Sequence, residues 1–176
     1  MLFDDTTEEF SQISSILTKF EEWRRNDFTA YKDTYFNLCL PKILGPMIRL
    51  NLVTWNPLDE HCQDLERMDW FNTVMKYAWS STETEEQLAV DPDVRLVPVL
   101  VEKIILPKIT EIIETCWDPL STSQTLKLVG VIGRLGREYP SLKPSSKYLR
   151  TLFITILDKM KLSLENDVFI PIFPKQ

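Results

Sequence analysis

The sequence predicts an all-α fold, and three observations support this class. Apolar residues recur every three or four positions over most of the 176 residues, which is the period of an amphipathic helix. No stretch alternates apolar and polar residues in the manner of a half-buried strand. Only four glycines are present, and no Asn-Gly pair, so the signals of a β-hairpin are missing. Hydrophobic residues make up 44% of the chain, which suits one packed helical domain over residues 1–176.

A capping pair and a long apolar stripe predict the first helix. Thr6 and Glu9 have the spacing at which a hydroxyl and a carboxylate satisfy free backbone N–H groups at a helix start. The stripe recurs at steps of three and four and comprises Phe10, Ile13, Leu17, Phe20 and Trp23. The charged residues near its end are expected on the other, polar faces: Glu21, Glu22, Arg24 and Arg25.

Prolines divide the next part of the chain. Asp27 suits the cap of a second helix that runs through Leu38 and is interrupted by Pro41, because proline cannot donate to the helical hydrogen bonds. The helical pattern then resumes as far as Leu52.

The segment Trp55-Asn56-Pro57-Leu58 predicts a helix end followed by a new helix start. Asn before Pro is a favourable cap followed by a favourable first helical position. The next helix is expected from about residue 63 to residue 79. Residues 80–91 are polar and acidic, which indicates an exposed loop.

Asp91-Pro92 is expected to open a long apolar helix that ends at Cys116-Trp117. Pro98 and Pro107 lie inside this stretch and predict kinks or breaks, because proline clashes with the preceding helical turn.

Two further helices and a tail are predicted after residue 120. Ser121 and Gln124 form a second capping pair, and the helix that follows has the stripe Leu128, Val131, Ile132 and Leu135. The last helix is expected from about residue 146 to residue 165, with the core residues Leu149, Leu152, Phe153, Ile156, Leu157 and Met160. The tail, residues 167–176, is apolar but contains two prolines, so we expect it to be extended and to lie on the helices.

Two short motifs each occur twice in the same order. They are Leu-Pro-Lys-Ile at residues 40–43 and 106–109, and Trp-Asx-Pro-Leu at residues 55–58 and 117–120. This internal repeat predicts two proline-bearing units, about 28–79 and 91–138, stacked as a short, HEAT-like α-solenoid. The other interpretation is that both motifs are general ways of ending a helix. Solenoids expose grooves, and grooves bind peptides or helices.

The charge is divided unevenly along the chain. The overall net charge is −6, but residues 1–120 sum to −11 and residues 121–176 to +5. Phosphate binding needs clustered cations, so a nucleic-acid surface is confined to the final third. Its candidate residues are Lys127, Arg134, Arg137, Lys143, Lys147 and Arg150. The alternative is that the two ends of the module attract differently charged proteins.

No pattern typical of an enzyme is present, so a non-enzymatic protein without cofactor, metal or small-molecule substrate is expected. His61 is the only histidine, and no nucleophile motif or set of metal ligands accompanies it. The three cysteines are far apart, which favours a reducing, intracellular compartment. No apolar run reaches the ~18 residues of a membrane span, and the acidic start does not resemble a signal peptide.

The remaining residues of interest are glycines and apolar side chains. Gly130, Gly133 and Gly136 fall inside a predicted helix, where small residues allow another helix to approach closely. Trp70 and Trp79 are candidate partner anchors. The apolar side chains of the tail are further candidates, with packing inside the chain as the alternative: Phe169, Ile170, Ile172 and Phe173.

The repeat and its surroundings resemble a known family. Residues 40–58 (LPKILGPMIRLNLVTWNPL), Trp70-Phe71, residues 106–130 (LPKITEIIETCWDPLSTSQTLKLVG) and residues 167–175 (DVFIPIFPK) are similar to the C-terminal part of the GC-rich sequence DNA-binding factor-like (GCFC) domain family. Within it, the chain is more similar to the GC-rich sequence DNA-binding factor and PAX-binding branch than to the tuftelin-interacting-protein branch.

This resemblance implies a part of a longer nuclear protein that acts in pre-mRNA splicing. It implies a scaffold that binds another splicing factor of the tuftelin-interacting-protein type in late spliceosomal complexes, through a peptide or a helix. The family name also mentions DNA binding, so a nucleic-acid-binding transcription regulator that uses the basic final third is the alternative. No membrane association is implied.

Overall fold

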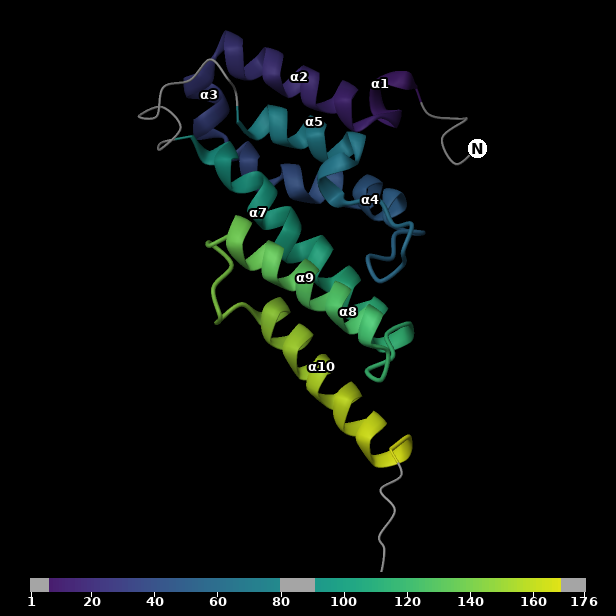
Figure 1. The fold of residues 1–176 in the computed structure, drawn as a ribbon. Helices are drawn as coiled ribbons and strands as arrows, with labels where there is room; N and C mark the ends of the chain where they lie inside the picture. The colour runs from purple at the N-terminus through teal and green to yellow at the C-terminus, as the bar shows by residue number, and fades with distance from the viewer. Residues whose placement is uncertain (1–6, 80–90, 169–176) are drawn as a thin grey trace, which may run out of the picture. The chain divides into compact units, whose positions relative to one another are not determined.

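The structure is a computed structural model that describes residues 7–79 and 91–168, and these ranges contain helices and turns but no strand (Figure 1). The predicted all-α class is therefore confirmed. The α-helices are α1 (Glu8–Ser11), α2 (Ile13–Asn26), α3 (Phe28–Asp33), α4 (Leu40–Asn51), α5 (Asp69–Ala78), α7 (Leu96–Leu100), α8 (Leu106–Thr115), α9 (Thr122–Glu138) and α10 (Lys147–Asn166). Short 3-10 turns, η1 (Phe36–Leu38), η2 (Leu65–Arg67) and η3 (Pro92–Arg95), and a π-helical segment, η4 (Val101–Ile105), lie between them.

The chain divides into two compact units. Unit 1 comprises Met1–Trp55 and Gln63–Ile104, and unit 2 comprises Asn56–Cys62 and Ile105–Gln176. Helices α1 to α7 thus belong to unit 1, and α8 to α10 belong to unit 2. The single domain predicted from the sequence and its stacking as a short solenoid stay predictions.

Unit 1 has its core where α2 packs against α5 and α4 packs against α7 (Figure 1). Along α4, the side chains of Leu40, Leu44 and Ile48 recur every four residues on one face and are fully buried. The other buried apolar side chains of unit 1 are Ile13, Ile16, Leu17, Tyr31, Leu52, Trp55, Leu65, Trp70, Phe71, Val74, Tyr77, Ala78, Leu96, Val97, Leu100, Val101 and Ile104.

The first predicted helix is interrupted at Gln12, whose extended backbone (φ −127°, ψ 138°) separates α1 from α2. Thr7 occupies the cap position of α1, and its side chain makes no capping hydrogen bond. The predicted pair of Thr6 with Glu9 falls partly outside the described residues. Phe10, which was expected in the buried stripe, lies before the break and is exposed.

Asp27 caps α3 as predicted, because its carboxylate accepts a hydrogen bond from the backbone N–H of Ala30 at 2.9 Å. The helix is shorter than predicted and ends at Asp33, since Tyr35 adopts the left-handed conformation (φ 51°, ψ 32°) that an α-helix does not pass through. The predicted interruption at Pro41 is wrong. Pro41 lies in the first turn of α4, where the missing N–H would have no acceptor within the helix in any case.

The two Trp-Asx-Pro-Leu motifs, residues 55–58 and 117–120, fold into the same corner. Asn56 and Asp118 each accept, through Oδ1, a hydrogen bond from the N–H of the leucine two residues later, at 3.1 and 2.9 Å. The side chain thus closes a turn on its own backbone. No helix begins at Asn56, the predicted cap. The helix predicted from about residue 63 to residue 79 is present but shorter, because α5 begins only at Asp69 and ends at Ala78.

The tryptophans of the two corners are also equivalent. Trp55 and Trp117 are both buried, and each indole Nε1–H donates to the residue eight positions later. The acceptors are the backbone oxygen of Gln63 at 3.1 Å and the hydroxyl oxygen of Thr125 at 3.4 Å. The sequence repeat therefore corresponds to a repeat of local structure.

Asp91-Pro92 opens a helical stretch as predicted, but the geometry of that stretch changes along its length. It runs through η3, α7, η4 and α8 and ends at Thr115. Pro98 lies inside α7, and Pro107 lies in the first turn of α8, directly after the π-helical segment. No break is present at Pro98 or Pro107, because the stretch is helical throughout; near Pro107 its geometry changes from π to α. A π-helical turn accommodates the carbonyl groups that proline cannot bond to.

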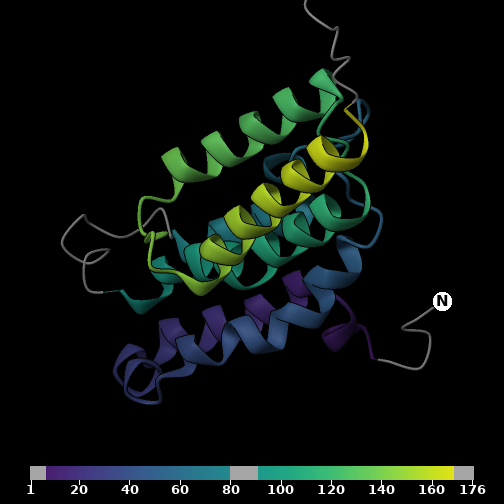
Figure 2. The ribbon, with the colours of Figure 1, turned by 90° about the horizontal axis from the view of Figure 1, so that it is seen from below.

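Unit 2 is built on α8, along which α10 lies (Figure 2). Ser121 caps α9 as predicted, since its hydroxyl accepts from the N–H of Gln124 at 3.4 Å. The second predicted hydrogen bond of this pair, from the N–H of Ser121 to the Gln124 side chain, is wrong. The Gln124 side chain instead accepts from the N–H of Asp118 at 2.8 Å, because the N–H of Ser121 already donates to the Asp118 carbonyl. The buried apolar residues of unit 2 are Leu58, Ile105, Leu106, Ile109, Ile112, Ile113, Trp117, Leu128, Leu135 and Leu152.

The last predicted helix is confirmed as α10, but its predicted core is largely wrong. Leu152 is fully buried, whereas Phe153, Leu157 and Met160 are exposed. Apolar residues occupy more than one side of this helix, and only the side that packs on α8 is covered.

Candidate interaction surfaces

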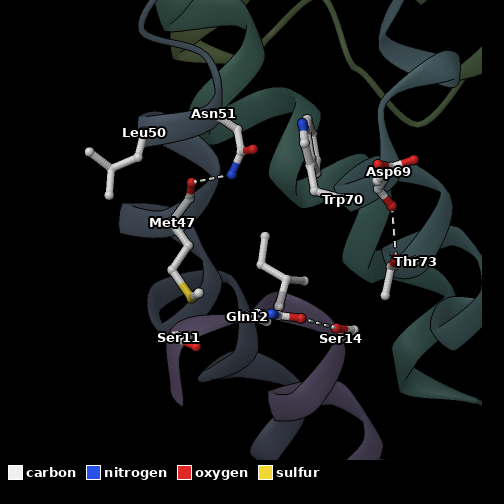
Figure 3. Close-up of a pocket in the computed structure, with 10 residues that line it drawn as sticks. Ser11, Gln12, Ser14, Met47, Leu50, Asn51, Asp69, Trp70 and Thr73 are labelled. Atoms are coloured by element: carbon white, nitrogen blue, oxygen red, sulfur yellow. Dashed lines mark hydrogen bonds between the residues drawn. The ribbon is translucent and has the colours of Figure 1, made fainter. Parts of the chain in front are cut away.

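A cavity of about 280 Å³ lies in unit 1, where the break between α1 and α2 meets α4 and α5 (Figure 3). Trp70, a predicted partner anchor, lines this cavity, and its own side chain is buried. The Trp70 ring packs edge-on against Phe71, with 5.6 Å between ring centroids. The full lining is Ser11, Gln12, Ile13, Ser14, Met47, Leu50, Asn51, Asp69, Trp70 and Thr73.

Two polar side chains of this cavity have partners in their own helices. The amide of Asn51 donates to the carbonyl of Met47 at 2.9 Å, and the hydroxyl of Thr73 donates to the carbonyl of Asp69 at 2.8 Å, as Figure 3 shows. Ligand pockets usually hold ~300–1,000 Å³ and several convergent polar groups. The volume of the cavity lies below this range, so we do not assign it a ligand.

Trp79, the second predicted anchor, is 57% exposed at the end of α5. Trp70 and Trp79 lie nine residues apart on one helical segment, or roughly 13 Å along the axis. The structure therefore does not bring the two tryptophans together. The apolar tail residues Phe169, Ile170, Ile172 and Phe173 lie outside the described residues.

The six predicted nucleic-acid contacts are divided between two helices and the loop that joins them. They are Lys127, Arg134 and Arg137 on α9, Lys143 in the loop, and Lys147 and Arg150 on α10. Among them, the Lys127 ammonium donates to the Leu58 carbonyl at 3.4 Å, and that of Lys147 lies over the Tyr148 ring. Arg137, Lys143, Lys147 and Arg150 are exposed.

A buried polar cluster in unit 1 joins α2, α3, α5 and η3. Arg24, expected on a polar face, is 6% exposed and forms an ion pair with Asp91. Its guanidinium also donates to the carbonyl of Tyr77 at 3.3 Å and lies 3.7 Å from a carboxylate oxygen of Asp93. The hydroxyl of Tyr31 donates to Asp93 at 2.9 Å and lies 2.7 Å from the hydroxyl of Tyr77.

Burial raises the pKa of both phenols, Tyr31 and Tyr77, above the ordinary value of 10.0. For Tyr31, the hydrogen bond to Tyr77 and the negative charge of Asp93 raise the pKa further. All five side chains of the cluster are withdrawn from solvent, and catalysis requires access for a substrate. We therefore assign the cluster to folding. Sequence patterns could not find it, because the contacts of Arg24 join residues 53 and 67 positions apart.

The glycines of α9 face open space. A Cβ atom added at Gly130 or Gly136 would meet no atom within 4 Å, and one added at Gly133 would meet only the side chain of Arg137, at 3.5 Å. The predicted close approach of another helix is therefore wrong for the part of the chain that the structure describes.

An exposed apolar stripe runs along α10. It consists of Phe153, Leu157, Met160 and Leu164, which are 47%, 65%, 50% and 61% exposed. Their spacing of four, three and four residues places them on one side of the helix. We call these four residues the α10 stripe. Sequence reasoning assigned three of them to the core, because periodicity shows which residues share a face but not whether another element covers it.

Two classes of site are not seen in the described ranges. They contain no group of three or more His, Cys, Asp or Glu side chains that could hold a metal ion. They also contain no helix with the length and hydropathy needed to cross a bilayer.

Comparison with known proteins identifies relatives over nearly the whole chain. The family model described as GC-rich sequence DNA-binding factor-like protein matches residues 13–173. The chain is 44% identical over 179 residues to PAX3- and PAX7-binding protein 1 of Homo sapiens, covering 99% of the chain and 19% of that protein. It is 34% identical over 174 residues to the Intron Large complex component GCFC2 of Mus musculus, covering 99% and 22%.

A further match, over less of the chain, is the transcriptional repressor ILP1 of Arabidopsis thaliana, at 36% identity over 143 residues, covering 81% of the chain and 15% of that protein. The chain therefore spans about a fifth of the length of the first two curated relatives.

Proposed function

The chain belongs to the GC-rich sequence DNA-binding factor-like family, and on this premise we propose that it is a non-enzymatic interaction module of a nuclear pre-mRNA splicing protein. Its partner is another splicing factor, of the tuftelin-interacting-protein type, in a late spliceosomal complex. The name of one relative, an Intron Large complex component, supports a role in splicing.

The observation that carries this proposal is the α10 stripe. Contiguous apolar surface on a folded protein marks interaction sites, because leaving it in water is unfavourable. The chain also has a separate, well-buried core. A scaffold that binds a peptide or helix needs such a surface, and an enzyme would need a site of reactive groups instead.

The test is affinity capture from nuclear extract with the 176-residue chain as bait, with and without nuclease, read by quantitative mass spectrometry. We expect splicing factors to be retained after nuclease treatment, and a purified candidate from that set to bind the chain directly. If no splicing factor survives nuclease, the scaffold function is wrong.

A second candidate is a nucleic-acid-binding transcription regulator. The exposed cations Arg137, Lys143, Lys147 and Arg150 favour it, and the relative named a transcriptional repressor is consistent with it. Such binding weakens steeply with salt, because each phosphate contact releases counterions. Charge reversal at Arg134 and Arg137 should then abolish it. A lack of DNA and RNA binding at low salt would exclude this function.

A further inference from the structure

We propose that the α10 stripe docks an amphipathic helix of a partner protein, and that this helix carries carboxylates along one border of its apolar face. The proposal deepens the function proposed above by naming the surface and the chemistry of the partner. The surface itself is defined by the structure of unit 2.

The orientation of α10 is fixed by its contacts with α8. Leu152 and Ser163 are buried on the side that packs on α8. The ammonium of Lys159 donates to the carbonyl of Glu114 in α8 at 2.9 Å, which adds a polar contact on this side. The α10 stripe occupies the neighbouring side of the helix, and so it is presented to solvent and not to the core.

The spacing of the stripe suits a helix as its occupant. Residues four, three and four positions apart form the seam that one helix presents to another. From Phe153 to Leu164 the seam is about 16 Å long, at 1.5 Å per residue. A partner helix of roughly three turns therefore covers it.

The charges beside the stripe favour an acidic partner. Arg150 precedes Phe153 by three positions, and Lys161 follows Leu157 by four, so both cations lie at one border of the stripe. Lys161 is 74% exposed and lies 3.9 Å from Glu165, a pair that water screens strongly. Carboxylates on the partner helix would meet these two cations.

The same charges disfavour two other occupants. A second copy of this chain would bring Arg150 and Lys161 against a segment that is itself basic, since residues 121–176 sum to +5. Nucleic acid would meet the cations but would leave three aliphatic side chains of the stripe against phosphates and sugars. A protein helix with an apolar face and acidic border satisfies both the apolar and the charged parts of the surface.

The test uses matched variants of the 176-residue chain. Leu157→Glu places a charge in the stripe, and Leu162→Glu places the same charge on another side of α10, at a residue that is similarly exposed (65% and 55%). Arg150→Glu with Lys161→Glu reverses the border charge, and Lys42→Glu with Arg49→Glu, at two exposed cations of α4, is its control. Far-UV circular dichroism of each variant checks that the helices are retained.

The probe is a displayed library of 18-residue amphipathic helices whose border positions vary among Glu, Gln and Lys. We expect selection on the wild-type chain to enrich Glu at one border. The enriched peptide should bind at least tenfold more weakly to Leu157→Glu and to the double charge reversal on α10. It should bind normally to Leu162→Glu and to the double charge reversal on α4. Raising the salt concentration should weaken binding, because the border contacts are screened.

Several outcomes would overturn the proposal. The selection could enrich no peptide, or it could enrich Lys or Gln at the border. The selected peptide could also bind Leu157→Glu as well as it binds the wild type. Finally, the free chain could form a dimer in sedimentation that Leu157→Glu dissociates. Competition between an RNA and the selected peptide for the α10 stripe would also overturn the proposal. Because the library contains no cellular protein, the surface and the splicing function are tested separately. A splicing factor captured equally by wild type and Leu157→Glu would leave the function standing and refute the surface.

Discussion

Replacement of Arg24 by methionine tests the buried polar cluster of unit 1. The substitution keeps most of the apolar stem but removes the guanidinium that faces Asp91 and Asp93, whose side chains are 1% and 0% exposed. Both carboxylates would then be buried without their cation. A buried charge left without its partner is a strongly unfavourable state.

The size of the effect follows from the geometry. Two unit charges 3.7 Å apart, as for Arg24 and Asp93, attract by about 4 kcal/mol at an effective dielectric constant of ~20. Breaking a buried pair costs ~3–5 kcal/mol in other proteins, and a domain has only ~5–15 kcal/mol of stability. We therefore expect Arg24→Met to lower the free energy of unfolding by about 3–5 kcal/mol, measured by urea denaturation followed by circular dichroism.

The neighbouring arginine supplies a matched control. Arg25 is 72% exposed and pairs with Glu21 one turn earlier, a geometry worth ~0.3–0.5 kcal/mol. Arg25→Met should therefore change stability by no more than about 0.5 kcal/mol. Adding Asp91→Asn and Asp93→Asn to Arg24→Met should recover part of the loss, because the unpaired charges are removed. A loss below 1 kcal/mol for Arg24→Met would refute the reasoning.

Three further predictions follow from the described contacts. The free energy of unfolding should fall as the pH rises above 10, by up to ~1.4 kcal/mol per pH unit for each phenol, because Tyr31 and Tyr77 keep their protons only in the folded chain. Thermal melts from pH 8 to 11 check this, and the melting temperature should depend less on pH in the double phenylalanine variant. Gly130→Ala should stabilise the fold by about 0.5–1 kcal/mol in a thermal melt, since the added Cβ meets no atom within 4 Å and alanine favours a helix. A lower stability of this variant would contradict the open face of α9. Thr125→Val should cost about 1–3 kcal/mol in urea denaturation, because the buried indole N–H of Trp117 loses its acceptor; an unchanged midpoint would show that this bond contributes nothing.

Local signals predicted two of the helix starts and the fold class, because their physics is contained within a few residues. Asp27 and Ser121 cap helices through hydrogen bonds to N–H groups three positions away, and both are visible in the sequence. The break at Gln12 and the left-handed Tyr35 carry no such signal. Neither residue is of the type that usually marks a chain reversal, and so both helices were predicted too long.

The candidate surfaces were harder to predict, because exposure depends on residues distant in sequence. Periodicity showed that α10 is apolar, but only the position of α8 decides that Leu152 is covered and Leu157 is not. From its charge, Arg24 was predicted to lie at the surface. It is buried instead, where it pairs with two aspartates nearly seventy residues later in the sequence. Trp70 lines a cavity whose other residues come from three helical regions, and its role as a partner anchor stays a prediction.

The Arg24 cluster has a practical consequence for engineering. Arg24 holds the carbonyl of Tyr77 and the carboxylate of Asp91 at the same guanidinium, so the two ends of the intervening stretch are tied to one point of α2. Engineered variants of this chain should therefore keep Arg24, because its replacement would release Tyr77 and Asp91 from α2 at the same time.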